Sequence, residues 1–143
     1  MCAGDWIVDL GEGRRFLQYT SCCIINDFGT EKLAGIPLRS GNKVLPHNLR
    51  ETAGVLFEHG VNDLVVIHFP EGAYLSSKDA LEIIQPFLQL PDDFTIGKMG
   101  AGDSFCAGVL YGSYQGWSDD KTVRQLKRPR PDPCSPRWVA RIR

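Results

Sequence analysis

Long hydrophobic runs are missing from this sequence of 143 residues. A membrane-spanning helix needs about 18 or more consecutive apolar residues, and the apolar stretches here are short and interrupted. The N-terminus also lacks the basic region and apolar core of a secretory signal. We therefore expect a cytoplasmic protein that makes no membrane contact. The 43% apolar and 23% charged residues are ordinary for a globular protein, and the length suits one domain.

The sequence also has no Cys-x-x-Cys pair among its five cysteines. An odd number of cysteines without paired spacing argues against a disulfide framework and against a zinc site. Cys22 and Cys23 are adjacent, so their side chains are expected on opposite faces of a strand. The simplest expectation is that the cysteines are buried free thiols.

The net charge of -1 conceals two regions of opposite sign. Residues 1–125 carry ten basic and sixteen acidic residues, whereas residues 126–143 carry six basic residues and one acidic residue. The second region also holds four prolines, which do not fit a helix interior. A disordered or unrelated end is the interpretation that we favour. A basic tail that binds nucleic acid is the alternative, but the tail lacks the aromatic residues interleaved among basic ones that are typical of such surfaces.

Buried strands and a helix alternate in the middle of the chain. The apolar runs at residues 21–26 and 64–67 predict two strands covered on both faces. Between them, residues 47–59 place apolar side chains at helical spacing, and Gly60 follows where a helix often ends. The stretch before this helix is expected to be a loop, with at most a short helix at 31–34. A helix followed by a buried strand is typical of an α/β layered fold.

Weaker signals surround this unit. Residues 6–8 predict a short strand, which the glycines and arginines of 11–15 are expected to end. Residues 73–84 predict a hairpin with a polar turn. A glycine-rich loop at 97–102 precedes a predicted helix at 103–115.

The clearest chemical motif is the segment 100–105, Gly-Ala-Gly-Asp-Ser-Phe, at the start of that helix. The first N–H groups of a helix have no intrahelical partner and lie at the positive end of the helix dipole, so they bind anions. Gly100 and Gly102 would let a phosphate approach the backbone closely. The Asp103 carboxylate could then accept a proton from an attacking hydroxyl. The alternative is an ordinary turn in which Asp103 caps the helix.

With its flanking residues, the segment 100–112 resembles the second signature of the ribokinase-like (PfkB-type) carbohydrate kinases, a GAGD loop followed by a helix of small and apolar residues. The resemblance implies that Asp103 is the catalytic base and that Gly100, Ala101 and Gly102 form an anion hole for the phosphate of ATP. It further implies an ATP-dependent kinase that transfers the γ-phosphate to a hydroxyl of a sugar or sugar-like substrate, with ATP and Mg²⁺ as cofactors.

The resemblance extends upstream of the GAGD loop. Residues 64–74 resemble the strand and loop of this family that approach the nucleotide phosphates. This makes His68, Glu71 and Gly72 candidate nucleotide-binding residues, with a packing role as the alternative for His68. Residues 22–26 resemble the strand that ends in the family motif Asn-x-x-Glu, which organises magnesium and phosphate.

That motif is incomplete in this sequence. Asn26 is present and is a candidate metal-site residue, but Gly29 stands where the family has glutamate. Magnesium is usually bound through one or two carboxylates together with phosphates and waters. Asp27 and Glu31 are the nearby carboxylates that could replace the missing one, and the sequence leaves this open.

The resemblance implies a truncated three-layer α/β/α ribokinase-like fold with a mostly parallel sheet. We interpret residues 1–15 as a divergent N-terminal segment, 16–125 as a partial carbohydrate kinase domain and 126–143 as a basic tail rich in proline and arginine. Members of this family are longer, and their N-terminal half binds the sugar, so the sequence does not name the substrate. The alternative function is a non-catalytic kinase remnant that binds nucleotide or a partner. A homo-oligomer or a complementing N-terminal half is the partner expected in that case.

Overall fold

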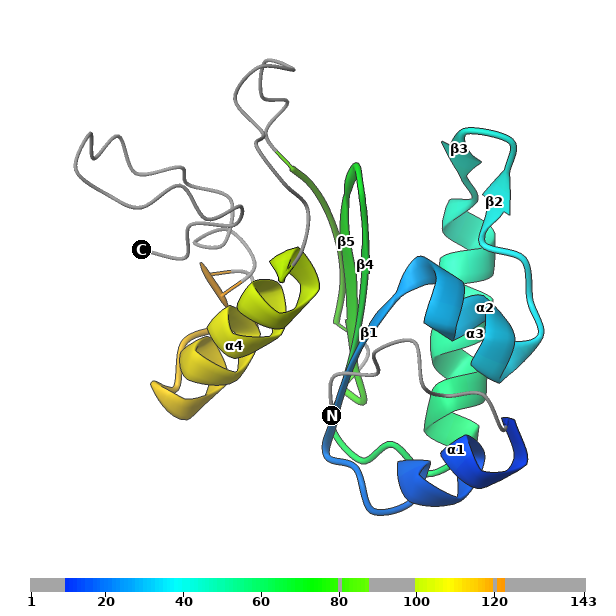
Figure 1. Cartoon of the computed structure of the whole chain (residues 1–143). Coiled ribbons are helices and arrows are strands. Elements are labelled where there is room, and N and C mark those ends of the chain that lie inside the picture. The colour runs from blue at the N-terminus through cyan, green and yellow to red at the C-terminus, as the bar shows by residue number, and fades with distance from the viewer. Residues whose placement is uncertain (1–9, 80, 88–99, 120, 123–143) are drawn as a thin grey trace. The chain divides into compact units, whose positions relative to one another are not determined.

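The computed structural model describes residues 10–79, 81–87, 100–119 and 121–122 (Figure 1). The expected strand at 6–8, residues 97–99 of the glycine-rich loop and the basic tail lie outside the described residues. The chain divides into two compact units, residues 1–84 and residues 85–143. Each unit is described by itself below.

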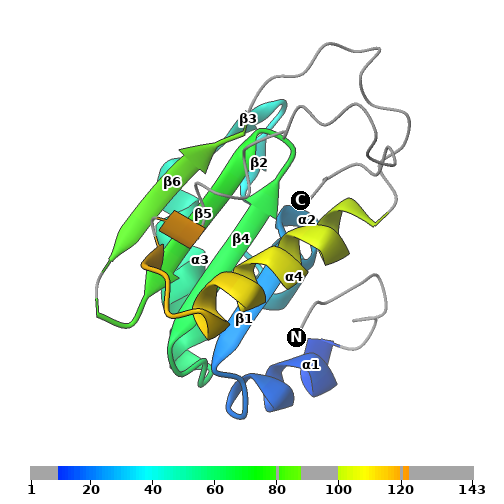
Figure 2. The same cartoon turned by 90° about the vertical axis from the view of Figure 1, so that its left-hand side faces the viewer.

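A mixed sheet forms the centre of the first unit, and its described strands have the order β1-β4-β5-β6 (Figure 2). β1 pairs with β4 in parallel, with Cys23 opposite Val65, whereas β4 and β5 are antiparallel. The strands predicted from the apolar runs and the predicted hairpin are confirmed. The sheet is mixed rather than mostly parallel because β4 and β5 are joined by a tight turn instead of a crossover helix. The bounds are β1 (Cys22–Asn26), β4 (Leu64–Phe69), β5 (Gly72–Ser77) and β6 (Glu82–Pro86).

Helices of the first unit lie on one side of this sheet, as Figure 1 shows. α2 contacts β1 and β4, and α3 contacts β4 and β5. These layers confirm the α/β fold class. A two-stranded antiparallel hairpin connects α2 to α3. The bounds are α1 (Leu10–Leu17), α2 (Asp27–Ala34), β2 (Arg39–Ser40), β3 (Lys43–Val44) and α3 (Pro46–Glu58).

The side chains of a strand point alternately to the two faces of the sheet, and the apolar runs are continuous because both faces are buried. Ile25 and Ile67 belong to the core that packs beneath the helices. Ile24 and Val66 point to the opposite face, and they are also buried, with 1% and 0% of their surface exposed. Both faces of the strand pair are therefore covered, as the absence of polar alternation predicts.

Helix α3 confirms the predicted helical spacing. Proline at the first helical position suits a helix start, because its N–H would have no intrahelical partner. Leu49, Ala53 and Leu56 are buried along one side. The helix ends at His59, and Gly60 then adopts a φ of 110°, which L side chains rarely do.

Helix α2 replaces the loop that was expected after β1. It begins at Asp27, directly after the last residue of the strand. Oδ1 of Asn26 accepts a hydrogen bond from the Gly29 N–H at 2.7 Å, which is an N-cap contact. Gly35 ends the helix in the left-handed conformation with a φ of 74°. These two caps define the helix although it buries only Thr30 and Leu33.

Helix α1 covers residues that were expected to break regular structure. Its helical form is supported by tertiary contacts rather than by propensity, since two glycines lie within it. Leu17 is buried in the core, and Nε of Arg14 donates to the Leu33 carbonyl at 3.0 Å. This second contact ties α1 to the end of α2.

The cysteines only partly follow the expectation of buried free thiols. Cys23 is a free thiol, and burial raises its pKa to about 11. Cys106, by contrast, is disulfide-bonded, which corrects the expectation for that residue. Sequence spacing gave no signal for this bond because disulfide partners meet only through the fold.

Two buried threonines provide a matched test of core polarity. Thr30 donates from Oγ1 to the Asn26 carbonyl at 2.6 Å, whereas Oγ1 of Thr52 has no partner among the described residues. Both residues are fully buried. Thr30→Val should lower the free energy of unfolding by about 1 kcal/mol, because it removes a buried hydrogen bond. Thr52→Val should leave it unchanged or raise it by up to about 1 kcal/mol, because it removes an unsatisfied hydroxyl. Urea denaturation measures both, and equal losses would contradict the hydrogen-bond assignment.

The second unit contains helix α4 (Ala101–Tyr114), which confirms the helix predicted at 103–115. Its buried side includes Phe105 and Gly112. A Cβ atom at Gly112 would lie 2.5 Å from Cγ2 of Thr122, so the absence of a side chain permits this close approach. Phe105 also packs against Phe87, with ring centroids 5.7 Å apart. None of the helices in the described part of the chain has the length and apolarity needed to cross a membrane.

Candidate functional site

Helix α4 begins directly after Gly100, within the segment for which the sequence predicts an anion hole. Gly100 is the N-cap, with a φ of 78° in the left-handed region that favours glycine. It offers no side-chain cap, and among the described residues, apart from its chain neighbours, no atom lies within 4 Å of the position where its Cβ would be. Its carbonyl accepts the Ser104 N–H at 2.9 Å, which starts the helical ladder. The earlier N–H groups of the first turn have no intrahelical partner.

Asp103 lies exposed in this first turn, two residues after the first helical residue Ala101. The interpretation of Asp103 as the N-cap is therefore wrong, because Gly100 occupies that position. A carboxylate in the first turn is favoured by the helix dipole.

The end of β1 is arranged differently from the family motif. Asn26 lies opposite His68 on β4, and its side-chain oxygen is already used to cap α2. A Cβ atom at Gly29 would lie 3.0 Å from that oxygen and 3.1 Å from Cγ1 of Ile25. The glycine therefore permits the tight cap, and no carboxylate stands at this position.

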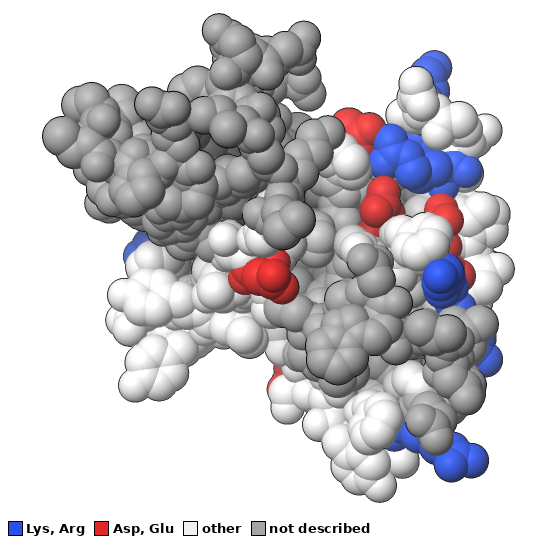
Figure 3. All heavy atoms as spheres, in the orientation of Figure 1, with Lys and Arg blue, Asp and Glu red and all other residues white. Residues whose placement is uncertain are grey.

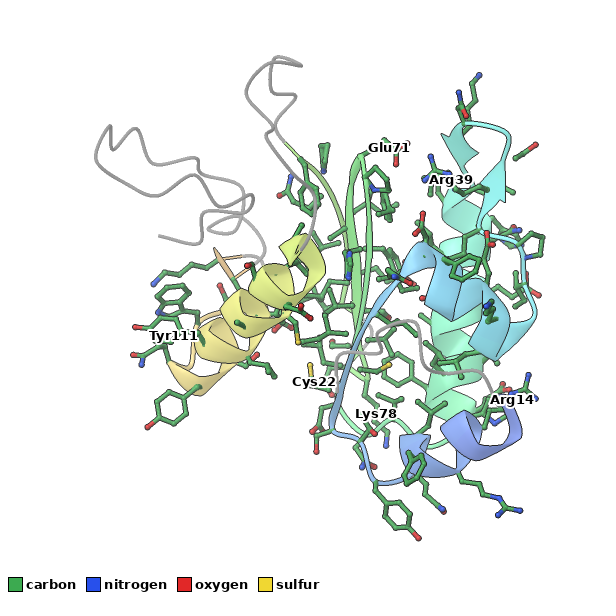
Figure 4. The ribbon with its side chains drawn as sticks, in the orientation of Figure 1. Arg14, Cys22, Arg39, Glu71, Lys78 and Tyr111 are labelled. Atoms are coloured by element: carbon green, nitrogen blue, oxygen red, sulfur yellow. The ribbon has the colours of Figure 1, made fainter. Side chains whose placement is uncertain are left out.

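Acidic and basic side chains lie next to one another on the face of the first unit that includes β2, β3 and α2 (Figure 3). Arg39 of β2 is central to this arrangement. Its Nη1 donates to Oδ2 of Asp27 at 3.2 Å and to Oε2 of Glu71 at 3.1 Å. Nη2 donates to Oε1 of Glu71 and, at 3.2 Å, to the Asn42 carbonyl. Figure 4 shows Arg39 and Glu71 approaching each other from β2 and from the turn between β4 and β5.

These contacts determine what the nearby carboxylates can do. The hydrogen bonds from Arg39 hold the pKa of Glu71 below its ordinary value. Glu31 is engaged as well, since its Oε1 accepts the Leu38 N–H at 2.6 Å. Both carboxylates that could replace the missing glutamate, Asp27 and Glu31, thus have structural partners.

The three candidate nucleotide-binding residues lie close together in the sequence but belong to different secondary-structure elements. His68 is part of β4, Glu71 lies in the turn, and Gly72 is the buried first residue of β5. Burial lowers the pKa of His68, and the charge of Asp27 opposes this shift. The imidazole is therefore mainly neutral in the folded chain at neutral pH.

This lowered pKa predicts a pH dependence of stability. As the pH falls through about 6.5, the unfolded chain binds a proton at His68 before the folded chain does. The free energy of unfolding should therefore decrease as the pH drops from about 7.5 to about 5.5. One proton limits the slope to about 1.4 kcal/mol per pH unit. Urea denaturation of the wild type and of His68→Gln tests this, and identical slopes for both would contradict it.

The structure thus brings together two sets of residues, each within its own unit. Asn26, Asp27, Arg39 and Glu71 form one set, and residues 100–103 form the other. Sequence reasoning missed Arg39. The available signal was the Gly-Asn pair between two short segments, which is typical of a hairpin turn and would have placed Arg39 on a strand.

The residues at the end of β1 do not fit a magnesium site of the family type. The oxygen of Asn26 caps a helix, Gly29 has no carboxylate, and Asp27 is paired with Arg39. Within the described residues, no group of three or more His, Cys, Asp or Glu side chains could hold a metal ion.

Comparison with solved structures defines the fold as ribokinase-like. The ribokinase of Arabidopsis thaliana, complexed with ribose and ATP, matches with a TM-score of 0.67 and 18% identity, over 78% of this chain and 34% of that chain. Phosphofructokinase-2 of Escherichia coli matches with a TM-score of 0.64 and 18% identity, over 82% of this chain and 36% of that chain. This chain therefore spans about a third of the length of these structures. An E. coli protein of the same fold was crystallised with ATP and Mg²⁺.

The family itself is shown by sequence. The model of the pfkB family of carbohydrate kinases matches residues 9–125. The chain belongs to this family, which confirms the resemblance seen in the GAGD segment. No curated protein matches the sequence.

Proposed function

We propose that this chain is part of an ATP-dependent carbohydrate kinase that transfers the γ-phosphate of ATP to a hydroxyl of a sugar or sugar-like substrate. The observation that carries the proposal is the start of α4, where a left-handed Gly100 precedes an exposed Asp103. Membership of the pfkB family supports it. The cytoplasmic location expected from the sequence remains part of this proposal.

In this proposal, the first turn of α4 acts on the transferred group. The backbone N–H groups of Gly100, Ala101 and Gly102 donate to phosphate oxygens, which stabilises the charge of the transferred phosphoryl group. The substrate hydroxyl oxygen forms a bond to the γ-phosphorus while the bond from that phosphorus to the ADP oxygen breaks. The hydroxyl proton passes to the Asp103 carboxylate.

No step of this reaction involves a metal ion at the end of β1, because the side chains there do not fit a magnesium site. His68, Glu71 and Gly72 remain candidates for the nucleotide side of the site. The acceptor is proposed only as a sugar or a related polyol. The proteins of known structure with this fold include complexes with ribose and with myo-inositol.

A second candidate function is favoured by the altered β1 end. Gly29 removes the carboxylate of the family motif, and the chain spans about a third of the matching structures. We infer as the alternative a non-catalytic remnant that binds nucleotide or a partner. Its partner would be a second copy of the chain or a complementing N-terminal half. In either case we interpret residues 16–125 as the partial kinase domain, between a divergent segment at 1–15 and a basic tail at 126–143.

One pair of measurements separates the two functions. The full chain is assayed for ADP formation from ATP with ribose, fructose 6-phosphate and myo-inositol, and ATP binding is measured by calorimetry. Sugar-dependent ADP formation supports the kinase. ATP binding without any sugar-dependent turnover supports the remnant, and the absence of both contradicts a nucleotide site in this chain.

A further inference from the structure

The two terminal nitrogens of Arg39 donate to acceptors within the protein. A guanidinium carries two N–H bonds on each terminal nitrogen. Nη1 meets Asp27 and Glu71, and Nη2 meets Glu71 and the Asn42 carbonyl. The four terminal N–H bonds therefore match four acceptor contacts. The charge of Arg39 is directed at the two carboxylates rather than at a phosphate.

Both carboxylates take part in this contact, and Glu71, whose side chain is 44% exposed, accepts two of the hydrogen bonds. Oδ2 of Asp27 and Oε2 of Glu71 meet the same nitrogen, Nη1 of Arg39. The side chains of Arg39 and Asp27 are 24% and 21% exposed, so solvent and salt screen this pair less than a fully exposed one. Asp27 also accepts the N–H of Phe28 at 3.0 Å through its other oxygen.

Two further side-chain oxygens near this end of the sheet also accept hydrogen bonds. The side-chain oxygen of Asn26 accepts the Gly29 N–H, and Oε1 of Glu31 accepts the Leu38 N–H. A larger residue at position 29 would crowd the Asn26 oxygen at 3.0 Å. A divalent cation would therefore have to compete with Arg39 and with these hydrogen bonds for oxygen ligands here.

We propose that Arg39 is an internal counter-ion that replaces a divalent cation at the carboxyl end of β1, and that this end of the sheet does not bind Mg²⁺. The inference rests on the proposed function in one respect, because it concerns a cofactor of the proposed kinase reaction. Removing the guanidinium should release Asp27 and Glu71 as oxygen ligands. Carboxylate oxygens suit Mg²⁺ and Mn²⁺ alike, so Mn²⁺ serves as the probe.

The test is paramagnetic broadening by Mn²⁺ of backbone amide signals in NMR spectra of the full chain, without nucleotide. In the wild type, the signals of Asp27, Phe28 and Glu71 should keep their intensity. In Arg39→Met they should lose most of it. Arg39→Lys is the matched control, since it keeps a positive charge and should still exclude the ion. Asp27→Asn added to Arg39→Met should restore the signals.

Broadening of these signals in the wild type would overturn the proposal, and so would a folded Arg39→Met chain whose signals are unaffected. The wild-type measurement needs no variant, so the proposal stays testable if Arg39→Met does not fold. The experiment contains neither ATP nor sugar. Its outcome is therefore separate from that of the kinase assay, and a failure of one does not imply a failure of the other.

Discussion

Asp103→Asn is expected to lower sugar-dependent ADP formation by about 10²–10⁴-fold, the usual contribution of a general base. Asparagine has nearly the same shape as aspartate but cannot accept the hydroxyl proton. Asp103 is exposed at the start of α4, so the substitution should leave the fold intact. Steady-state kinetics measures the rate, and circular dichroism confirms that the helix content is unchanged.

Asp79→Asn is the matched control for this experiment. Asp79 is also exposed, but it lies in the turn between β5 and β6 rather than at a helix start. Its substitution should leave the rate within about twofold of the wild type, as for surface positions without a catalytic contact. If Asp103→Asn retained activity comparable to Asp79→Asn, the assignment of the base would be wrong.

Gly60→Ala is expected to destabilise the first unit by about 3–5 kcal/mol, which combines two separate effects. The φ of 110° strains any residue with a side chain, and the new Cβ would lie 2.6 Å from Cα of Gln18. Because that neighbour is backbone, it cannot move aside as a flexible side chain would. Such a loss is a large part of the stability of a typical domain, so much of the chain should be unfolded.

Gly35→Ala separates the two effects. Gly35 also has a positive φ, of 74°, but no atom lies within 4 Å of the position where its Cβ would be. Gly35→Ala should lower the free energy of unfolding by only about 1 kcal/mol, because only the backbone conformation is strained. Urea denaturation followed by circular dichroism measures both variants. Equal losses at the two positions would show that the contact with Gln18 is not the dominant cause.

The elements that the sequence predicted well are those with their own apolar pattern. Strands β1 and β4 are continuous apolar runs, and α3 has buried residues at helical spacing. Helix α2 was anticipated only in part, as a short helix at 31–34, because it buries only Thr30 and Leu33 and depends on a single capping side chain. Helix α1 was missed because its support comes from a contact between Arg14 and a distant carbonyl, which no local pattern records.

The same distinction applies to the candidate site. The turn at 100–103 could be predicted because every group it uses is local: two glycines, a helix start and a carboxylate. The ion-pair cluster could not, since Arg39 lies 12 residues from Asp27 and 32 from Glu71. Only the folded chain brings these side chains together.

The direct passage from β1 into α2 also limits how this part of the chain can change in length. Strand and helix share no spacer, because Asn26 ends one and caps the other. A residue inserted after Asn26 would turn the helix by about 100° about its axis, given 3.6 residues per turn. Gly29 and exposed Lys32 would take the places of Thr30 and Leu33, and the latter two would move to the half-buried positions of Glu31 and Ala34. The junction between β1 and α2 can therefore accept substitutions more readily than insertions or deletions.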